Sequence, residues 1–234
     1  MDLGSGDIRR PRRSRARPAG PSPESSPMPH SRTKAIAALC VALALPAATF
    51  SPAYAAPAPQ APAYEIATVN GSGCPPGSAT VTPEPTGFSV RYTGFTAKSG
   101  GDAKPTDFRK NCQISLKVTV PEGMTYAVKG VDHRGFAELG AATTGQLKSS
   151  FYFSGHAQTA VHTKEVPGPD ANEWLLSYRV PPADLQWIRC YDVSRLNLNT
   201  EVRLASSDTS KPAIVDVNSD FGTSYYLEWK KACD

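Results

Sequence analysis

The sequence lacks a long apolar segment, a basic domain and any helical periodicity. Its longest apolar run, residues 35–45, has eleven residues, fewer than the ~20 that a membrane-spanning helix needs. Residues 56–234 carry 17 basic and 18 acidic side chains. A nucleic-acid-binding domain is therefore excluded there, because binding to phosphates needs clustered positive charge. No window of ten or more residues combines a 3.6-residue period with helix caps, so long helices are not expected.

Familiar catalytic and cofactor motifs are also missing. The chain has no G-x-S-x-G, H-E-x-x-H, P-loop or dinucleotide fingerprint. The Gly71-Ser72-Gly73 stretch precedes no helix and predicts a turn. No two cysteines have C-x-x-C spacing, and no histidine lies within five residues of a cysteine. We therefore expect neither a metal site nor a cofactor.

The first 63 residues read as three segments outside the folded domain. Residues 1–27 are rich in Arg and Pro and predict a disordered extension, with a true start at Met28 as the alternative that places them upstream of the protein. Residues 28–55 have the three parts of a secretory signal peptide: Arg32 and Lys34, the apolar run, and Ala53-Tyr54-Ala55 at the cleavage site. Residues 56–63 form an Ala/Pro-rich linker. We expect a secreted, extracellular protein without a stable membrane anchor.

Four cysteines remain after cleavage, an even number in an oxidising compartment. We expect Cys74–Cys112 and Cys190–Cys233 disulfides. The first would pin the end of the polar loop 96–107 to the start of the domain, and the second would hold the C-terminus beside the strand that follows Cys190. Cys74–Cys233 with Cys112–Cys190 remains the alternative, since chain termini often lie close together.

Residues 64–234 alternate with period two, which predicts strands with one face on a core and one in water. Ile114, Leu116 and Leu198 are examples of the inward set. We expect an all-β, antiparallel two-sheet sandwich of roughly ten strands, stapled by two disulfides. The full inward set is Phe88, Val90, Tyr92, Cys112, Ile114, Leu116, Val118, Val120, Tyr126, Val128, Leu196, Leu198, Thr200, Val202, Leu204, Tyr225, Leu227 and Trp229.

Six short segments occur in the order found in a known family. They are residues 70–77, 109–112, 131–136, 151–155, 196–200 and 225–233. On these segments the chain resembles the secreted family named domain of unknown function 4360, from bacteria and fungi, over about residues 64–234. The resemblance implies secretion and the extent of the domain, and it implies no particular activity.

Two groups of polar residues are candidates for binding. Asp132 and Arg134 share a strand face, where they could pair laterally or bind a polar ligand, with His133 on the opposite face. Asn197 and Asn199 line another strand face. With an exposed Trp174 or Trp187 that face could bind sugar, because amides bond to hydroxyls and rings stack on the apolar sugar face. His156 and His162 are expected at the surface, too far apart on an extended strand to share a metal.

The sequence favours a binding or interaction module over an enzyme. Its ligand is expected to be extracellular, a cell-envelope glycan or another polymer or protein. The alternatives are a hydrolase with dispersed catalytic residues, which predicts a cleft holding a titratable group of shifted pKa, and a structural or inhibitory protein, for which the loop 96–107 is the candidate.

Overall fold

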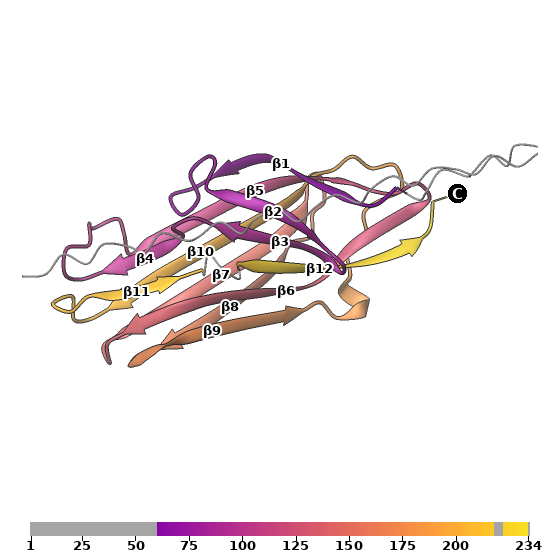
Figure 1. Ribbon diagram of the computed structural model, residues 1–234. Helices are drawn as coiled ribbons and strands as arrows, with labels where there is room; N and C mark the ends of the chain where they lie inside the picture. The colour runs from indigo at the N-terminus through magenta and orange to yellow at the C-terminus, as the bar shows by residue number, and fades with distance from the viewer. Residues whose placement is uncertain (1–59, 218–221, 234) are drawn as a thin grey trace, which may run out of the picture. The chain divides into compact units, whose positions relative to one another are not determined.

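The computed structural model describes residues 60–217 and 222–233, which form two packed antiparallel sheets (Figure 1). Segments 1–27 and 28–55, with most of the 56–63 linker, lie outside these residues. The first sheet has the order β1-β5-β10-β7-β8. Its strands are β1 (Ala63–Asn70), β5 (Arg109–Thr119), β7 (Thr143–Phe153), β8 (Ala160–Pro167) and β10 (Leu196–Ser206).

The second sheet has seven strands in the order β2-β3-β12-β6-β11-β4, with β9 paired to β6 outside this path. Residues 130–133 of β6 lie between β12 and β9. The strands are β2 (Ala79–Glu84), β3 (Gly87–Tyr92), β4 (Thr96–Ser99), β6 (Met124–Leu139), β9 (Asp170–Arg179), β11 (Ala213–Asp216) and β12 (Thr223–Lys231). The described residues add one 3-10 turn, η1 (Pro182–Asp184). The predicted all-β sandwich is therefore confirmed, with twelve strands instead of about ten.

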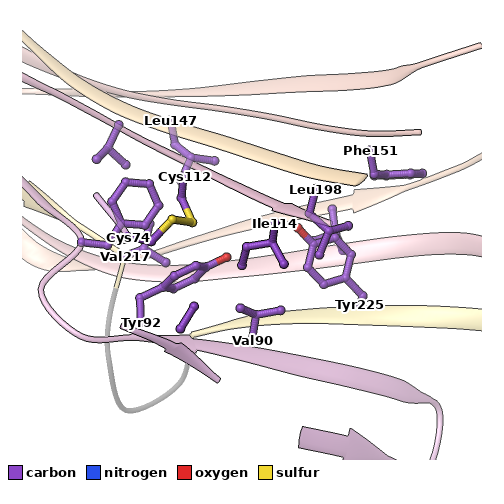
Figure 2. Close-up of a cluster of buried hydrophobic side chains, with 14 of the residues drawn as sticks. Cys74, Val90, Tyr92, Cys112, Ile114, Leu147, Phe151, Leu198, Val217 and Tyr225 are labelled. Atoms are coloured by element: carbon purple, nitrogen blue, oxygen red, sulfur yellow. A yellow bond between two sulfur atoms is a disulfide. The ribbon is translucent and has the colours of Figure 1, made fainter. Parts of the chain in front are cut away.

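The alternation predicted from the sequence sets which side chains fill the space between the sheets. Along β10, Leu196, Leu198, Thr200, Val202 and Leu204 are all buried and the residues between them are more exposed. In β5, Cys112, Ile114 and Leu116 are buried, whereas Val118 and Val120 are half-buried because the strand ends at Thr119. Figure 2 shows Ile114 and Leu198 of one sheet near Val90, Tyr92 and Tyr225 of the other.

Both predicted disulfides are present. Cys74–Cys112 lies within the core, where the two cysteines are 0% and 2% exposed (Figure 2). Cys190–Cys233 ties the exposed segment after η1 to the end of β12. They close segments of 38 and 43 residues, and each pins a non-strand segment to the sandwich.

The polar loop expected at 96–107 is shorter than predicted. Its first four residues form β4, which pairs with β11. Each of these strands has only four residues, too few for a clear alternation, and neither was expected from the sequence. In Figure 1, β4 and β11 lie at the left, and the end of β12, which precedes Cys233 of the second disulfide, lies at the right.

Candidate functional site

A turn at residues 189–192 carries an exposed tyrosine in a backbone conformation that tyrosine rarely adopts. The amide of Asp192 donates to the carbonyl of Arg189 at 3.1 Å, which closes the turn. Tyr191, the third residue of this turn, has φ 62°. Turns with positive φ at that position favour Gly or Asn, and a larger residue there stores strain. The side chain is nevertheless 79% exposed.

The chain on both sides of Tyr191 is fixed. Cys190 is bonded to Cys233. The Asp192 carboxylate accepts from the amide and the hydroxyl of Ser194 at 2.8 and 2.6 Å, and His156 Nε2 lies 3.2 Å from its other oxygen. The hydrogen bonds from Ser194, followed by the contact with His156, hold the pKa of Asp192 below its ordinary value. The ring of Tyr191 is therefore presented on a preorganised turn.

This turn borders a surface hollow of about 640 Å³, which we call the Tyr191 hollow. Residues at the end of β5, the segment after η1 and Cys233 also line it. Val193, 93% exposed, adds an apolar side chain next to the turn. The charged and aromatic lining residues are Lys117, Glu122, Arg189, Tyr191, Asp192 and Arg195. A concave surface that combines apolar side chains with a few polar groups is typical of a ligand site.

The hollow continues into the outer face of the five-stranded sheet. Arg195 lines the hollow, and Asn197 and Asn199 follow it along β10. Asn197 is paired in register with Tyr152 of β7 on one side and with Ser115 of β5 on the other. Its amide nitrogen donates to the Ser154 hydroxyl at 2.8 Å. Amide and hydroxyl groups thus surround a half-buried tyrosine on this face.

The tryptophans proposed for that face lie elsewhere, which corrects the sequence interpretation. Trp174 belongs to β9 of the other sheet and is 7% exposed. It packs over Gly135, where an added Cβ would fall 2.2 Å from the indole ring, so only glycine fits. Trp187 is half-buried, pairs with Ala127 and lies under the Lys230 ammonium, 3.8 Å from the ring centroid. Neither ring joins Asn197 and Asn199; Tyr152 is the aromatic residue beside them.

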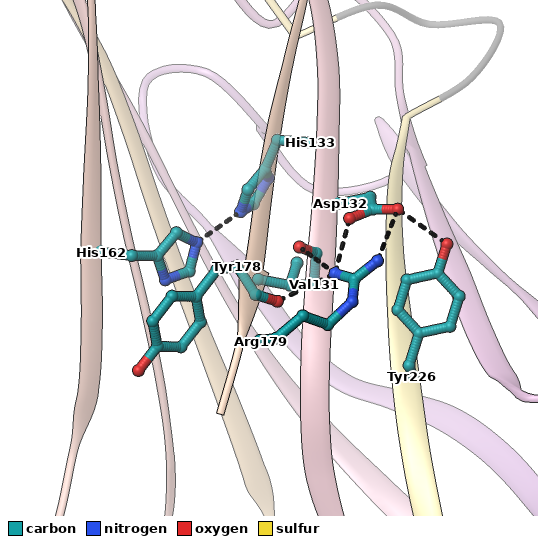
Figure 3. Close-up of polar contacts among 7 residues, drawn as sticks. All are labelled: Val131, Asp132, His133, His162, Tyr178, Arg179 and Tyr226. Atoms are coloured by element: carbon teal, nitrogen blue, oxygen red, sulfur yellow. Dashed lines mark hydrogen bonds and ion pairs between the residues drawn. The ribbon is translucent and has the colours of Figure 1, made fainter. Parts of the chain in front are cut away.

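Asp132 pairs with a different arginine from the one that the sequence suggested (Figure 3). Arg179 of β9 makes two hydrogen bonds to its carboxylate, at 2.7 and 3.2 Å, and the Tyr226 hydroxyl donates a third at 2.9 Å. The guanidinium also lies 4.7 Å from the Tyr226 ring centroid. Arg134 shares the outer face but is exposed. The partner was missed because β9 reaches β6 only through tertiary pairing.

The Asp132 group is a closed network. Burial opposes ionisation of Asp132, but hydrogen bonds from Arg179, Ser177 and Tyr226 outweigh that effect and hold its pKa below the ordinary value. Arg179 and Asp132 meet in the bidentate geometry that guanidinium and carboxylate favour, and Arg179 also donates to the carbonyls of Val131 and Tyr178. This arrangement leaves the carboxylate little capacity for a ligand and makes the network a structural connection between β6, β9 and β12.

Two histidines meet in the core between the sheets, which corrects the expectation that His162 lies at the surface. His133 of β6 is 0% exposed and His162 of β8 is 7% exposed, and their Nε2 atoms are 3.1 Å apart (Figure 3). His133 Nδ1 lies 2.9 Å from the Thr223 hydroxyl, and His162 stacks on the Tyr178 ring at 4.6 Å. Burial lowers the pKa of His133 to about 3 and that of His162 to about 4, so both are neutral at pH 7.

Within residues 60–217 and 222–233, no group of three or more His, Cys, Asp or Glu side chains is arranged to hold a metal ion. The same residues contain no helix that is long and apolar enough to span a membrane.

Residues 63–233 match the family model named domain of unknown function (DUF4360). The chain belongs to this family. An uncharacterized secreted protein from Arthroderma benhamiae is 26% identical over 169 residues, which cover 70% of this chain and 69% of the relative. The family match confirms the resemblance noted in the sequence, and the secreted relative confirms the prediction that the protein is secreted and extracellular.

One solved structure covers much of this chain at low similarity. It is a complex of TmCBM61 with beta-1,4-galactotriose, 12% identical, covering 72% of this chain and 88% of that chain with a TM-score of 0.29. This likeness is too low to bear on the ligand of the DUF4360 chain.

Two residues of the candidate site were missed at the level of the sequence, Tyr191 and Tyr152. Tyr152 was visible as the one outward aromatic of an alternating strand, but its pairing with Asn197 depends on the sheet register. For Tyr191 the local signal was an aromatic residue between a half-cystine and an Asp-x-Ser turn. Its exposure and positive φ depend on the disulfide partner 43 residues away.

Proposed function

We propose that this secreted protein is a glycan-binding module that uses the Tyr191 hollow. The observation that carries the proposal is the exposed Tyr191 ring, held at φ 62° beside a polar concavity. Backbone strain persists where the surrounding structure imposes it, and it concentrates at ligand sites. Here the disulfide and the Asp192 contacts impose it.

The chemistry of the surroundings suits a sugar. The flat apolar face of a pyranose stacks on an aromatic ring, and its hydroxyls bond to guanidinium, amide and carboxylate groups. Arg195 and Arg189 line the hollow with Tyr191, and the Asn197 amide with Tyr152 extends the polar surface along β10. The ligand therefore contacts the hollow first and the outer face of the sheet next to it.

A hydrolase is less well supported by the same geometry. His133 and His162, the histidines whose pKa values burial lowers, lie in the core and do not line the Tyr191 hollow. A hydrolase needs such groups in contact with its substrate.

A glycan array with wild type, Tyr191→Ala and Leu175→Ala tests the proposal. Leu175 is the matched control, because it is 47% exposed but lies on β9 in the other sheet. We expect a defined set of glycans to bind wild type and Leu175→Ala equally and Tyr191→Ala at least tenfold more weakly. An array without bound glycans, or equal binding by all three proteins, would overturn the proposal.

A further inference from the structure

A second hollow lies at the opposite end of β5 and β10. It has a volume of about 730 Å³ and is lined by Phe108, which precedes β5, and by residues 203–206 at the end of β10. We call it the Phe108 hollow. Phe108 is 45% exposed. The Tyr191 hollow, by contrast, is lined by the last residues of β5 and by Arg195, just before β10.

The Phe108 hollow is basic. Lys98, Lys104 and Arg203 line it, all exposed, and no Asp or Glu is among its lining residues. Asp102 and Asp208 are neighbours of lining residues in the sequence but do not line the hollow themselves, and two further acidic groups are engaged: Asp107 pairs with Lys110, and Glu201 pairs with Arg109. Within the described parts of the chain, the ion pairs do not include the three lining cations.

The walls of the Phe108 hollow are fixed by backbone contacts. Gly100 has φ 70°, and a Cβ there would fall 2.0 Å from the Lys211 carbonyl oxygen, so the two loops pack tightly. The Lys104 amide donates to the Asp107 carboxylate at 3.0 Å, and the Lys98 amide donates to the Asp107 carbonyl at 2.9 Å. The loop therefore holds its cations around a preformed surface.

The Tyr191 hollow also has basic groups without an acidic partner. Lys117, Arg189 and Arg195 line it and form no ion pair with the described residues. Of its two acidic groups, Asp192 is engaged with Ser194 and His156, which leaves Glu122. The sheet face between the two hollows is mostly neutral, with amides and hydroxyls that include Gln113, Ser115, Ser150, Asn197 and Asn199.

We infer that the ligand is an anionic polysaccharide that runs along β5 and β10 and reaches both hollows, an inference that rests on the proposed glycan-binding function. The span requires a chain-like ligand, because eight residue steps from Arg195 to Arg203 cover about 26 Å of extended strand. Each hollow offers one exposed aromatic ring and three cations. A polymer that occupies both gains affinity over a short one, because its second contact is intramolecular.

Binding of dextran and dextran sulfate tests the charge, because the two share one backbone. We expect long dextran sulfate to bind at least tenfold more tightly than dextran of equal length, and its affinity to fall as salt rises. A sulfated oligosaccharide shorter than the span should bind at least tenfold more weakly than the long polymer. Polygalacturonate and poly(glycerol phosphate) then show whether carboxylate or phosphate serves in place of sulfate.

Two variants, each of which removes one positive charge, test where on the protein the polymer binds. Arg203→Gln should weaken binding of the long polymer at least fivefold and Lys164→Gln, on β8 outside both hollows, should leave it unchanged. Equal binding of dextran and dextran sulfate, equal binding of short and long chains, or equal effects of the two variants overturns this inference. If Tyr191→Ala still weakens glycan binding in those cases, the proposed function stands; if it has no effect, the proposed function fails as well.

Discussion

The interior between the sheets and the Tyr191 hollow follow opposite rules. In the interior, most side chains are apolar, the buried polar ones include the facing pair His133 and His162, and large aromatic rings such as Tyr126 and Tyr225 are fully covered. At the hollow, an aromatic ring is 79% exposed, the backbone is strained, and cations have no acidic partner among the described residues. The interior is arranged for stability, whereas under the proposed function the strained turn at the hollow gives up stability for contact with a ligand.

One disulfide lies in the interior and the other flanks the turn at the Tyr191 hollow, and removing either one carries the largest expected effects. Cys74→Ala/Cys112→Ala and Cys190→Ala/Cys233→Ala should each lower the free energy of unfolding by about 4 kcal/mol, because each bridge closes a segment of about 40 residues. Only the second pair should weaken glycan binding, because it frees the turn that holds Tyr191. Urea titrations and binding at a temperature where both variants are folded measure this. Equal losses of binding would break the comparison.

The histidine pair makes the interior sensitive to acid. His133 and His162 have lowered pKa values in the folded protein, so below pH 6.5 the unfolded chain takes up protons that the folded chain does not. The free energy of unfolding should therefore fall as pH drops from 6.5 toward 4, by about 1.4 kcal/mol per pH unit for each histidine. His133→Gln should flatten this slope by about half in urea titrations from pH 7 to 4.5. Parallel curves for the variant and wild type would contradict it.

A smaller effect is expected where the hollow meets the sheet face. Tyr152→Ala should weaken glycan binding about threefold, less than Tyr191→Ala, because Tyr152 is half-buried beside Asn197 and offers only part of its ring. Isothermal titration with the glycan selected on the array measures the difference. A loss larger than that of Tyr191→Ala would move the centre of the site from the hollow to the sheet.

The smallest effect on glycan binding is expected from the Asp132 network, which belongs to the structural side of the comparison. Asp132→Asn should lower the free energy of unfolding by about 1 kcal/mol, because Arg179 is half-exposed and water screens the pair. Glycan binding should stay unchanged, since neither hollow includes these residues. Thermal unfolding and the glycan array check both outcomes. Loss of binding would return Asp132 to the candidate site.

The sequence predicted the interior far better than the hollow, for a physical reason. The alternation in β10 indicates directly which face of the strand is buried. Leu198 and Val202 could therefore be assigned to the interior without knowing which strands lie beside β10. The meeting of His133 with His162, 29 residues apart, depends on how the two sheets pack, and that of Asp132 with Arg179, 47 residues apart, depends on the pairing of β6 with β9. Local periodicity carries no such information.

The hollow was missed because its key feature is not a pattern of residue types. Trp174 drew attention as a large aromatic, but the close approach of Gly135 buries it. The exposed position of Tyr191 results from the 189–192 turn, the Cys190–Cys233 disulfide and the hydrogen bonds of the Asp192 carboxylate acting together. In sequence it is one tyrosine among nine.

Tyr191→Gly compared with Tyr191→Ala tests most directly whether stability is given up here for binding. Both variants remove the ring, so both should lose glycan affinity to the same extent, at least tenfold. Glycine adopts φ 62° without strain and alanine does not, so Tyr191→Gly should unfold with a free energy about 1 kcal/mol higher than Tyr191→Ala in urea. Equal stability of the two variants, or glycan affinity retained by either one, would contradict the account.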